Sequence, residues 1–314
     1  MRIVNILGII VGLCLFMMGM KIMSLGLSEL ANEKMRYMLN TLTDQKWKAI
    51  ICGSVMTALI QSSSAMMIMM IGLMNAHILP LQNAIWIILG AEIGTTMTSQ
   101  MIALDFGSLA PIIAVLGVIF YILPLSSTYH KLGQSMCGIG LLFIGLEIMT
   151  LSMEWLKDIS YFHILTTYLS HPLFALVMGM ILTTLIQSSS ASMGILQSLG
   201  KNQLISFHQG AFMILGFNIG TCITGFLASL SSCYNAKRLA FFQIIYNVFG
   251  TVLFFILSLT TPLLDVMASF TPSLVNQFAN YHTIFNVITT LIVIFIDRYF
   301  IQGIYYFLPL REDE

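Results

Sequence analysis

The stretch GSVMTALIQSSSA at residues 53–65 decides the fold, because it returns as GMILTTLIQSSSA at residues 179–191. The two stretches are identical at nine of thirteen positions, and they are 126 residues apart. At the same offset and without a gap, GAEIGTTMT at 90–98 meets GFNIGTCIT at 216–224, with five of nine positions identical. Matches that share one register indicate an internal duplication.

The composition places this duplicated chain in a lipid bilayer. Only 8% of its residues are charged and 58% are apolar, whereas soluble domains carry about 25% charged residues. Thirteen basic and thirteen acidic residues cancel, so there is no basic surface for nucleic acid. We therefore expect an all-α polytopic membrane protein.

The apolar segments predict seven spans and two hairpins, since a span needs about 20 mostly apolar residues. The expected spans are approximately 5–28, 82–104, 108–125, 134–155, 205–230, 238–260 and 282–308. Two further apolar stretches, about 49–76 and 172–199, are interrupted by the QSSS clusters. We expect each to be a re-entrant helical hairpin, because irregular backbone at membrane depth is tolerated where it is buried in protein or lines a wet cavity.

The hairpins determine the relation between the two copies. With a hairpin, each repeat crosses the membrane three times and the copies are inverted; with a full crossing instead, four crossings leave them parallel. The distribution of Lys and Arg gives the same orientation either way, with the N-terminus outside and the C-terminus cytoplasmic in the cell membrane. The expected division is a first repeat at 1–126, a second at 127–260, and a C-terminal helix and tail at 261–314.

Each QSSS cluster has the chemistry of an ion site. The residues after it begin a helix, so free backbone N–H groups and the positive end of the helix dipole lie at the tip. The six hydroxyls of Ser62, Ser63, Ser64, Ser188, Ser189 and Ser190 add donors for an anion. The amide oxygens of Gln61 and Gln187 suit a hard cation such as sodium. The alternative is that these side chains only join helices, but the paired clusters favour a site.

The second matched stretch predicts a broken helix in each copy. Gly90 and Gly94 are four residues apart, as are Gly216 and Gly220. Glycines at this spacing beside threonine allow local unwinding, which frees carbonyl oxygens for a cation. The same GxxxG pattern can instead be a face for close helix packing, but its repetition favours the unwound helix.

Paired QSSS hairpins, each followed by a G-x-N-I-G-T type of segment, resemble the type II sodium–phosphate cotransporter family. The resemblance implies an inverted-repeat carrier, not an enzyme, that couples inward sodium movement to the uptake of inorganic phosphate. It places phosphate at the six tip serines and sodium near Gln61 and Gln187. It also adds the unwound-helix residues Thr95, Thr96, Asn218 and Thr221 as sodium ligands.

The resemblance extends to the C-terminal half. Residues 242–247 and 281–286 are similar to the family's H-x-x-F-N helices, although Gln243 and Tyr246 replace His and Phe in the first. Many bacterial members carry a C-terminal cytosolic regulatory domain, so the chain resembles a short member without it. The implied partners are phosphate, sodium and lipid, with no resident cofactor, and the assembly could be a homodimer.

Glu92 departs from the family, which usually has Asn at this position, as the second copy does with Asn218. An acid at membrane depth is costly and is functional by default. Beside phosphate it would repel the anion unless it were protonated or bound to sodium. We therefore expect Glu92 to ligate a cation or to carry a proton in place of one sodium, the alternative being a contact with solvent or a polar neighbour.

Lys21 and Glu147 occupy equivalent positions, because GMKIM at 19–23 aligns with GLEIM at 145–149 at the 126-residue offset. Opposite charges near a pseudo-two-fold axis could neutralise each other in the membrane. We expect a structural pair, with a role of Lys21 at the substrate as the alternative.

Other functions remain open from the sequence. A carrier of another small oxyanion or of a dicarboxylate would use the same tips, and export would differ from uptake only in gradient and coupling. An intramembrane serine hydrolase is a remote alternative, because it would need one serine activated by a His or Lys base.

Overall fold

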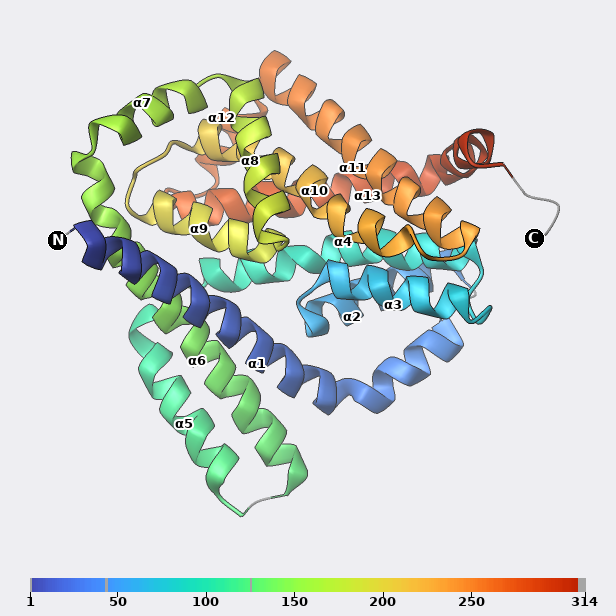
Figure 1. Cartoon of the computed structure of the whole chain (residues 1–314), viewed down its shortest axis with the longest axis horizontal. Coiled ribbons are helices and arrows are strands. Elements are labelled where there is room, and N and C mark those ends of the chain that lie inside the picture. Colours follow the sequence, from blue (N-terminus) through green and yellow to red (C-terminus); the bar gives the residue numbers. More distant parts are fainter. Residues whose placement is uncertain (1, 43–44, 125, 310–314) are drawn as a thin grey trace.

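The computed structural model describes residues 2–42, 45–124 and 126–309, and every regular element in these ranges is a helix (Figure 1). Helices satisfy their own backbone hydrogen bonds, as a lipid environment requires. In chain order they are α1 Arg2–Leu42, α2 Lys46–Ile60, α3 Ser63–Asn75, α4 Leu81–Ala103, η1 Gly107–Leu109, α5 Ala110–Ile122, α6 Ser127–Met153, η2 Glu154–Asp158, α7 Ser160–Leu169, α8 Pro172–Ile186, α9 Ser189–Lys201, α10 Phe207–Ser229, α11 Tyr234–Thr260, α12 Leu263–Ser269 and α13 Leu274–Phe307.

The contacts of α4 confirm the first re-entrant hairpin. Gly90 of α4 packs on Ile50 of α2, and Gly94 packs one turn further along on Ser54 and Thr57. Residue numbers rise together along the two helices, so α2 and α4 run in the same direction. Helix α3 must therefore return to the starting side before α4 begins. Gly216 and Gly220 of α10 pack on α8 in the same way, so α8 and α9 form the second hairpin.

Contacts between the repeats show that the copies are inverted. Helix α3 runs alongside α10, because Ser64 contacts Thr224 near its start and Asn75 accepts a hydrogen bond from the backbone N–H of Cys233 at its end. Since α3 runs opposite to α4, α10 also runs opposite to α4. Inverted repeats of this kind are the plan of many secondary transporters.

The two copies also agree in length. Helices α2 and α8 have 15 residues each, α3 and α9 have 13, and α4 and α10 have 23. Five of the described helices are long and apolar enough to cross a membrane alone, or up to seven if each of two bent pairs counts as one span. One bent pair is α4 with η1 and α5, at 77°, so the expected span at 108–125 forms only a 13-residue helix after the bend.

The expectation of an unwound helix is wrong for both copies, since α4 and α10 are continuous through their glycine pairs. A Cβ at Gly90 would lie 1.9 Å from the Ile50 carbonyl oxygen, and one at Gly216 would lie 2.0 Å from that of Leu176. The glycines are therefore required for close approach of each core helix to its hairpin. The GxxxG packing alternative is the correct one.

Helices α1 and α6 form an antiparallel pair, from which α5 and the adjoining half of α6 extend away from the rest of the protein (Figure 1). Small residues bring the two backbones together, with Gly12 against Gly145 and Met149, and Gly19 against Gly138 and Leu142. This pair is the scaffold against which the hairpins lie.

Candidate functional site

The tips of the two hairpins have the same backbone geometry. Gln61 and Gln187 end their helices in the left-handed region, at φ 56° and 57°. The next residues cap the following helices: Ser62 accepts a hydrogen bond from Ala65 N at 3.1 Å, and Ser188 accepts one from Ala191 N at 3.2 Å. A positive φ is uncommon for a residue other than glycine, so its repetition shows that each tip requires this turn.

The two tips line one cavity of about 400 Å³. All eight residues of the two QSSS clusters contribute to its surface. Helix α1 supplies one wall through Met17, Met20, Lys21 and Ser24. Because the first backbone N–H groups of α3 and α9 have no intrahelical partner, both helix N-termini present donors near this cavity.

Each tip is hydrogen-bonded to the core helix of the other repeat. The hydroxyl of Ser64 lies 2.9 Å from that of Thr224 on α10. The equivalent hydroxyl of Ser190 donates to Thr98 on α4 at 3.2 Å. Thr98 in turn donates to the amide oxygen of Gln61, so α4 joins both tips.

The scaffold also holds the first tip. The Ser24 hydroxyl donates to the carbonyl oxygen of Ile60 at 2.6 Å. Ile60 is the last residue of α2, directly before Gln61. Helix α1 is therefore fixed beside the cavity at this level.

The structure does not bring five of the expected sodium residues into the tip cavity. These residues are Glu92, Thr95, Thr96, Asn218 and Thr221, which are all buried but do not line it. The three threonine hydroxyls donate to carbonyl oxygens of their own helices at 2.8–3.0 Å. The amide of Asn218 does the same to Ile214 at 2.9 Å, so the expected free carbonyls are absent from these described turns.

Glu92 belongs to a separate buried polar cluster. Its carboxylate accepts a hydrogen bond from the Gln243 amide at 2.8 Å. Asn247, one turn beyond Gln243 on α11, is fully buried, and among the described residues its Oδ1 has no hydrogen-bond partner. Glu92 thus faces a polar neighbour rather than solvent, in a cluster that contains an unsatisfied amide oxygen.

The expected pair of Lys21 and Glu147 is wrong. Glu147 instead contacts Lys201 of α9, with Nζ and Oε2 3.4 Å apart. The reason is the crossing of α1 and α6, which places Gly19 against Gly138 and Gly12 against Gly145. Lys21 and Glu147 therefore lie at opposite ends of the crossing, on the order of 13 Å apart along the helices at 1.5 Å per residue.

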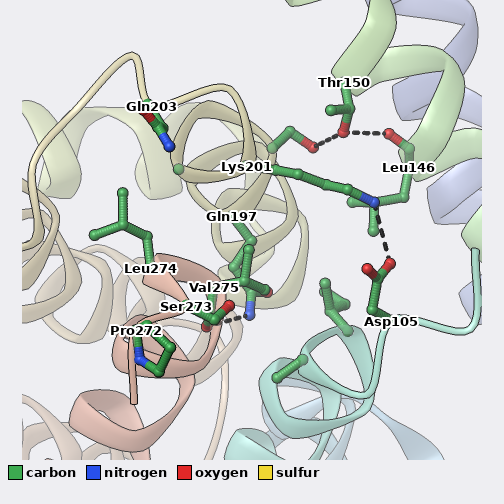
Figure 2. Close-up of a pocket in the computed structure, with 14 residues that line it drawn as sticks. Asp105, Leu146, Thr150, Gln197, Lys201, Gln203, Pro272, Ser273, Leu274 and Val275 are labelled. Atoms are coloured by element: carbon green, nitrogen blue, oxygen red, sulfur yellow. Dashed lines mark hydrogen bonds and ion pairs between the residues drawn. The ribbon is translucent and has the colours of Figure 1, made fainter. Parts of the chain in front are cut away.

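A second cavity, of about 230 Å³, lies at the far end of the second hairpin. Figure 2 shows Lys201 extending across it toward Asp105, to which it donates at 3.1 Å. The buried Gln197 donates to Ser99 O at 3.1 Å and to Val275 O at 3.2 Å. Together with the Lys201–Glu147 pair, these contacts attach α9 to α4, α6 and α13.

Three contributors to the site were missed by sequence reasoning. Thr98 and Thr224 connect the tips, and they are the last identical pair in the second matched stretch. The internal repeat could therefore have identified both threonines from the sequence. Gln243 is the contact of Glu92 and stands at the position of His in the family-like helices, whereas His282 at the other such position contacts Ser99 at 3.0 Å. Nothing in the sequence alone connects Gln243 to Glu92.

Comparison with known proteins agrees with an ion site at the paired hairpin tips. The family described as Na+/Pi-cotransporter matches the chain twice, over residues 15–151 and 152–295. No solved structure matches the chain.

Several individual proteins are similar to the chain. The uncharacterized protein YqeW of Bacillus subtilis is 32% identical over 94% of this chain and 96% of its own length. YjbB of Escherichia coli, a proposed inorganic phosphate export protein, is 23% identical, and the chain spans about half of it, covering 93% of this chain and 54% of YjbB. The human sodium-dependent phosphate transport protein 2B is 30% identical over a shorter region, 32% of this chain and 16% of that protein. With two family matches on an inverted-repeat membrane fold, the chain belongs to the Na+/Pi-cotransporter family.

Proposed function

We propose that this protein is a sodium-coupled symporter of inorganic phosphate and that the anion binds between the two hairpin tips. The observation that carries the proposal is the cavity shared by both QSSS clusters. Its ligands for phosphate are Ser62, Ser63, Ser64, Ser188, Ser189 and Ser190. A tetrahedral oxyanion accepts hydrogen bonds on all sides, and opposed tips supply donors from two directions.

Sodium has two kinds of candidate ligand in this proposal. Gln61 and Gln187 offer amide oxygens at the phosphate cavity itself. Glu92, buried beside Gln243, offers a second position. Here Glu92 binds sodium or carries a proton in its place.

The remaining candidates require a change of conformation. The side chains of Thr95, Thr96, Asn218 and Thr221 ligate sodium in a state in which they leave the carbonyl oxygens that they now contact. This part of the proposal depends on movement of α4 and α10.

Coupling follows from electrostatics. A doubly charged anion must cross a region of low dielectric, where unpaired charge is costly. Sodium bound beside it reduces the net charge of the loaded carrier, so that loading by both ions favours the crossing.

Alternating access then arises from movement of the hairpins against the α1–α6 scaffold. Ser62→Cys and Ser188→Cys test this, in a background in which the exposed Cys14 and the partly exposed Cys137 and Cys233 are replaced. We expect the labelling rates at the tips to change in opposite senses from the two sides of the membrane when sodium and phosphate are added. Rates that do not alternate contradict the movement.

Export is the second candidate, favoured by the similarity to YjbB, which is a proposed phosphate exporter. Direction in the cell depends on the gradients and on orientation, for which we propose the cell membrane, an outside N-terminus and a cytoplasmic C-terminus. A homodimer is the proposed assembly.

Uptake of labelled phosphate into proteoliposomes tests the function. We expect uptake with an inward sodium gradient and little with potassium, and competition by phosphate analogues but not by dicarboxylates. Efflux from preloaded liposomes at reversed gradients identifies an exporter. Absence of phosphate movement under every gradient contradicts the proposal, and Ser108→Ala on the exposed η1 is the control for tip variants such as Ser64→Ala.

A further inference from the structure

Lys21 occupies an unusual position for a cation. It lies in the apolar span of α1, residues 3–31, and this exposed residue is one of those that line the tip cavity together with the six serines. Among the described residues that line this cavity, it is the one that carries a charge. The lining of the tip cavity thus includes a lysine that its serine and glutamine chemistry does not require.

Lys21 also lacks a carboxylate partner. In the described part of the chain no carboxylate lies within 4.0 Å of its ammonium nitrogen, whereas Glu147, its equivalent in the other repeat, contacts Lys201. An unpaired charge at membrane depth is expensive and marks a functional position by default. A structural ion pair therefore does not account for this lysine.

The surrounding contacts hold the lysine at the tip. Ser24 lies three residues after Lys21, on the same face of α1, and its hydroxyl donates to Ile60 O at 2.6 Å. On the other face of α1, Gly19 packs directly on the backbone of Leu142. Helix α1 is thus fixed on both sides, and its Lys21 face is directed to the first tip.

The chemistry of the group matches an oxyanion. Lysine is a compact point charge on a flexible stem, with three N–H donors and no acceptor. Charge-assisted hydrogen bonds to phosphate are about twice as strong as neutral ones. Helix N-termini supply partial charge of about half a unit each, so an ammonium is the largest positive charge that the protein itself offers at this cavity.

The geometry points to Lys21 as the fixed cationic ligand of the transported oxyanion, completing a site of six hydroxyls, two helix N-termini and one ammonium. This inference rests on the proposed function. It adds that the carrier does not depend on sodium alone for positive charge.

Kinetics of sodium-driven phosphate uptake in proteoliposomes test the assignment, with Lys21→Gln, Lys21→Arg and Glu147→Gln compared with the wild type. We expect Lys21→Gln to raise the KM for phosphate about tenfold to hundredfold, as the loss of a charge-assisted hydrogen bond implies, with a smaller change in the KM for sodium. Lys21→Arg keeps the charge and should restore most of the affinity. Glu147→Gln removes a charge from the equivalent position but leaves the cavity intact, so its KM for phosphate should stay near that of the wild type.

Three outcomes overturn the role of Lys21 while the proposed function stands. One is an unchanged KM for phosphate in Lys21→Gln, the second is an equal rise in Glu147→Gln, and the third is a fall in maximal rate alone. Gel filtration and thermal melting in detergent identify variants that do not fold, in which case Lys21→Met and Lys21→Arg replace Lys21→Gln as the test pair. If the wild type itself does not transport phosphate under any gradient, it is the proposed function that fails, and the inference fails with it.

Discussion

The hydroxyl of Ser64, at the tip of the first hairpin, lies 2.9 Å from the hydroxyl of Thr224 in the core helix of the second repeat. The residues 126 positions away make the reciprocal contact, from Ser190 to Thr98 at 3.2 Å. Neither tip is therefore held by its own repeat alone. The cavity forms only where both copies meet. Removing a hydrogen bond that joins the repeats therefore measures how far the tips depend on one another.

A double-mutant cycle on Ser64→Ala and Thr224→Val measures this contact. We expect the two changes to be coupled by about 0.5–1.5 kcal/mol, the net worth of one hydrogen bond. Thermal unfolding in detergent gives the free energies. Ser64→Ala combined with Thr150→Val is the matched control, because the Thr150 hydroxyl donates to Leu146 O and Ser198 Oγ and contacts neither Ser64 nor the first tip. That pair should be additive within about 0.5 kcal/mol, and equal coupling in both pairs would contradict the contact.

Replacement of Gly90 by alanine should destabilise the protein by about 1–3 kcal/mol, the range for overpacking. The added Cβ would lie 1.9 Å from the Ile50 carbonyl oxygen, so α2 and α4 would have to separate. Gly72 in α3 is the control, since a Cβ there meets nothing within 4 Å. Gly72→Ala should be neutral or stabilising by about 0.5–1 kcal/mol, because alanine favours a helix. The melting temperatures of the two variants provide the comparison. Equal effects of Gly90→Ala and Gly72→Ala would contradict the packing role of Gly90.

Glu92→Gln tests the buried acidic cluster. Removal of the carboxylate should weaken sodium activation of phosphate uptake about tenfold or more if the group ligates the ion. If the group instead carries a proton, the pH dependence of uptake should flatten while sodium activation is kept. Initial rates across sodium concentration and pH distinguish the two. A variant in which both dependences match the wild type rules out a role for Glu92 in coupling.

The ion pair of Lys46 and Asp297 should contribute more to stability than the pair of Lys157 and Glu154. Lys46 Nζ lies 2.7 Å from Asp297 Oδ2, with side chains 27% and 13% exposed, and Trp86 donates to the same oxygen at 3.1 Å. The other pair is 3.8 Å apart and 48% and 66% exposed. Asp297→Asn should cost about 1–3 kcal/mol, and Glu154→Gln less than about 1 kcal/mol. Detergent melts of both variants provide the comparison, and equal costs would contradict it.

Lys201 should hold the second hairpin equally well from neutral to moderately alkaline pH. It lies beyond the apolar part of that hairpin, where burial lowers its pKa but hydrogen bonding and the charges of Asp105 and Glu147 raise it by more, so that the net pKa is raised. A raised folded-state pKa gives stability that is fully present below the unfolded value of about 10.4, and that is lost as the pH rises through the folded value. The difference in melting temperature between the wild type and Lys201→Gln should be constant from neutral pH up to that limit. A difference that disappears near neutral pH would contradict the raised pKa.

Much of the architecture could be predicted because the duplication is encoded in identical residues. The QSSS clusters share one register, and a polar cluster in an apolar stretch is tolerated at membrane depth mainly where it lines a cavity. From these facts the hairpins and the inverted copies follow, and the helix contacts confirm both. The role of Gly90 and Gly94 did not follow, because a GxxxG pattern allows either unwinding or close packing, and only the position of α2 decides between them.

The sequence by itself determined the membrane class, the two copies and the residues at the tips, since composition and repetition are properties of the chain alone. Tertiary structure decided which charges meet. Lys21 and Glu147 are equivalent in sequence, yet the antiparallel crossing of α1 and α6 sends one to the tip cavity and the other to Lys201. Electrostatic partners depend on distances of a few ångströms in space, and a repeat offset along the chain does not specify those distances.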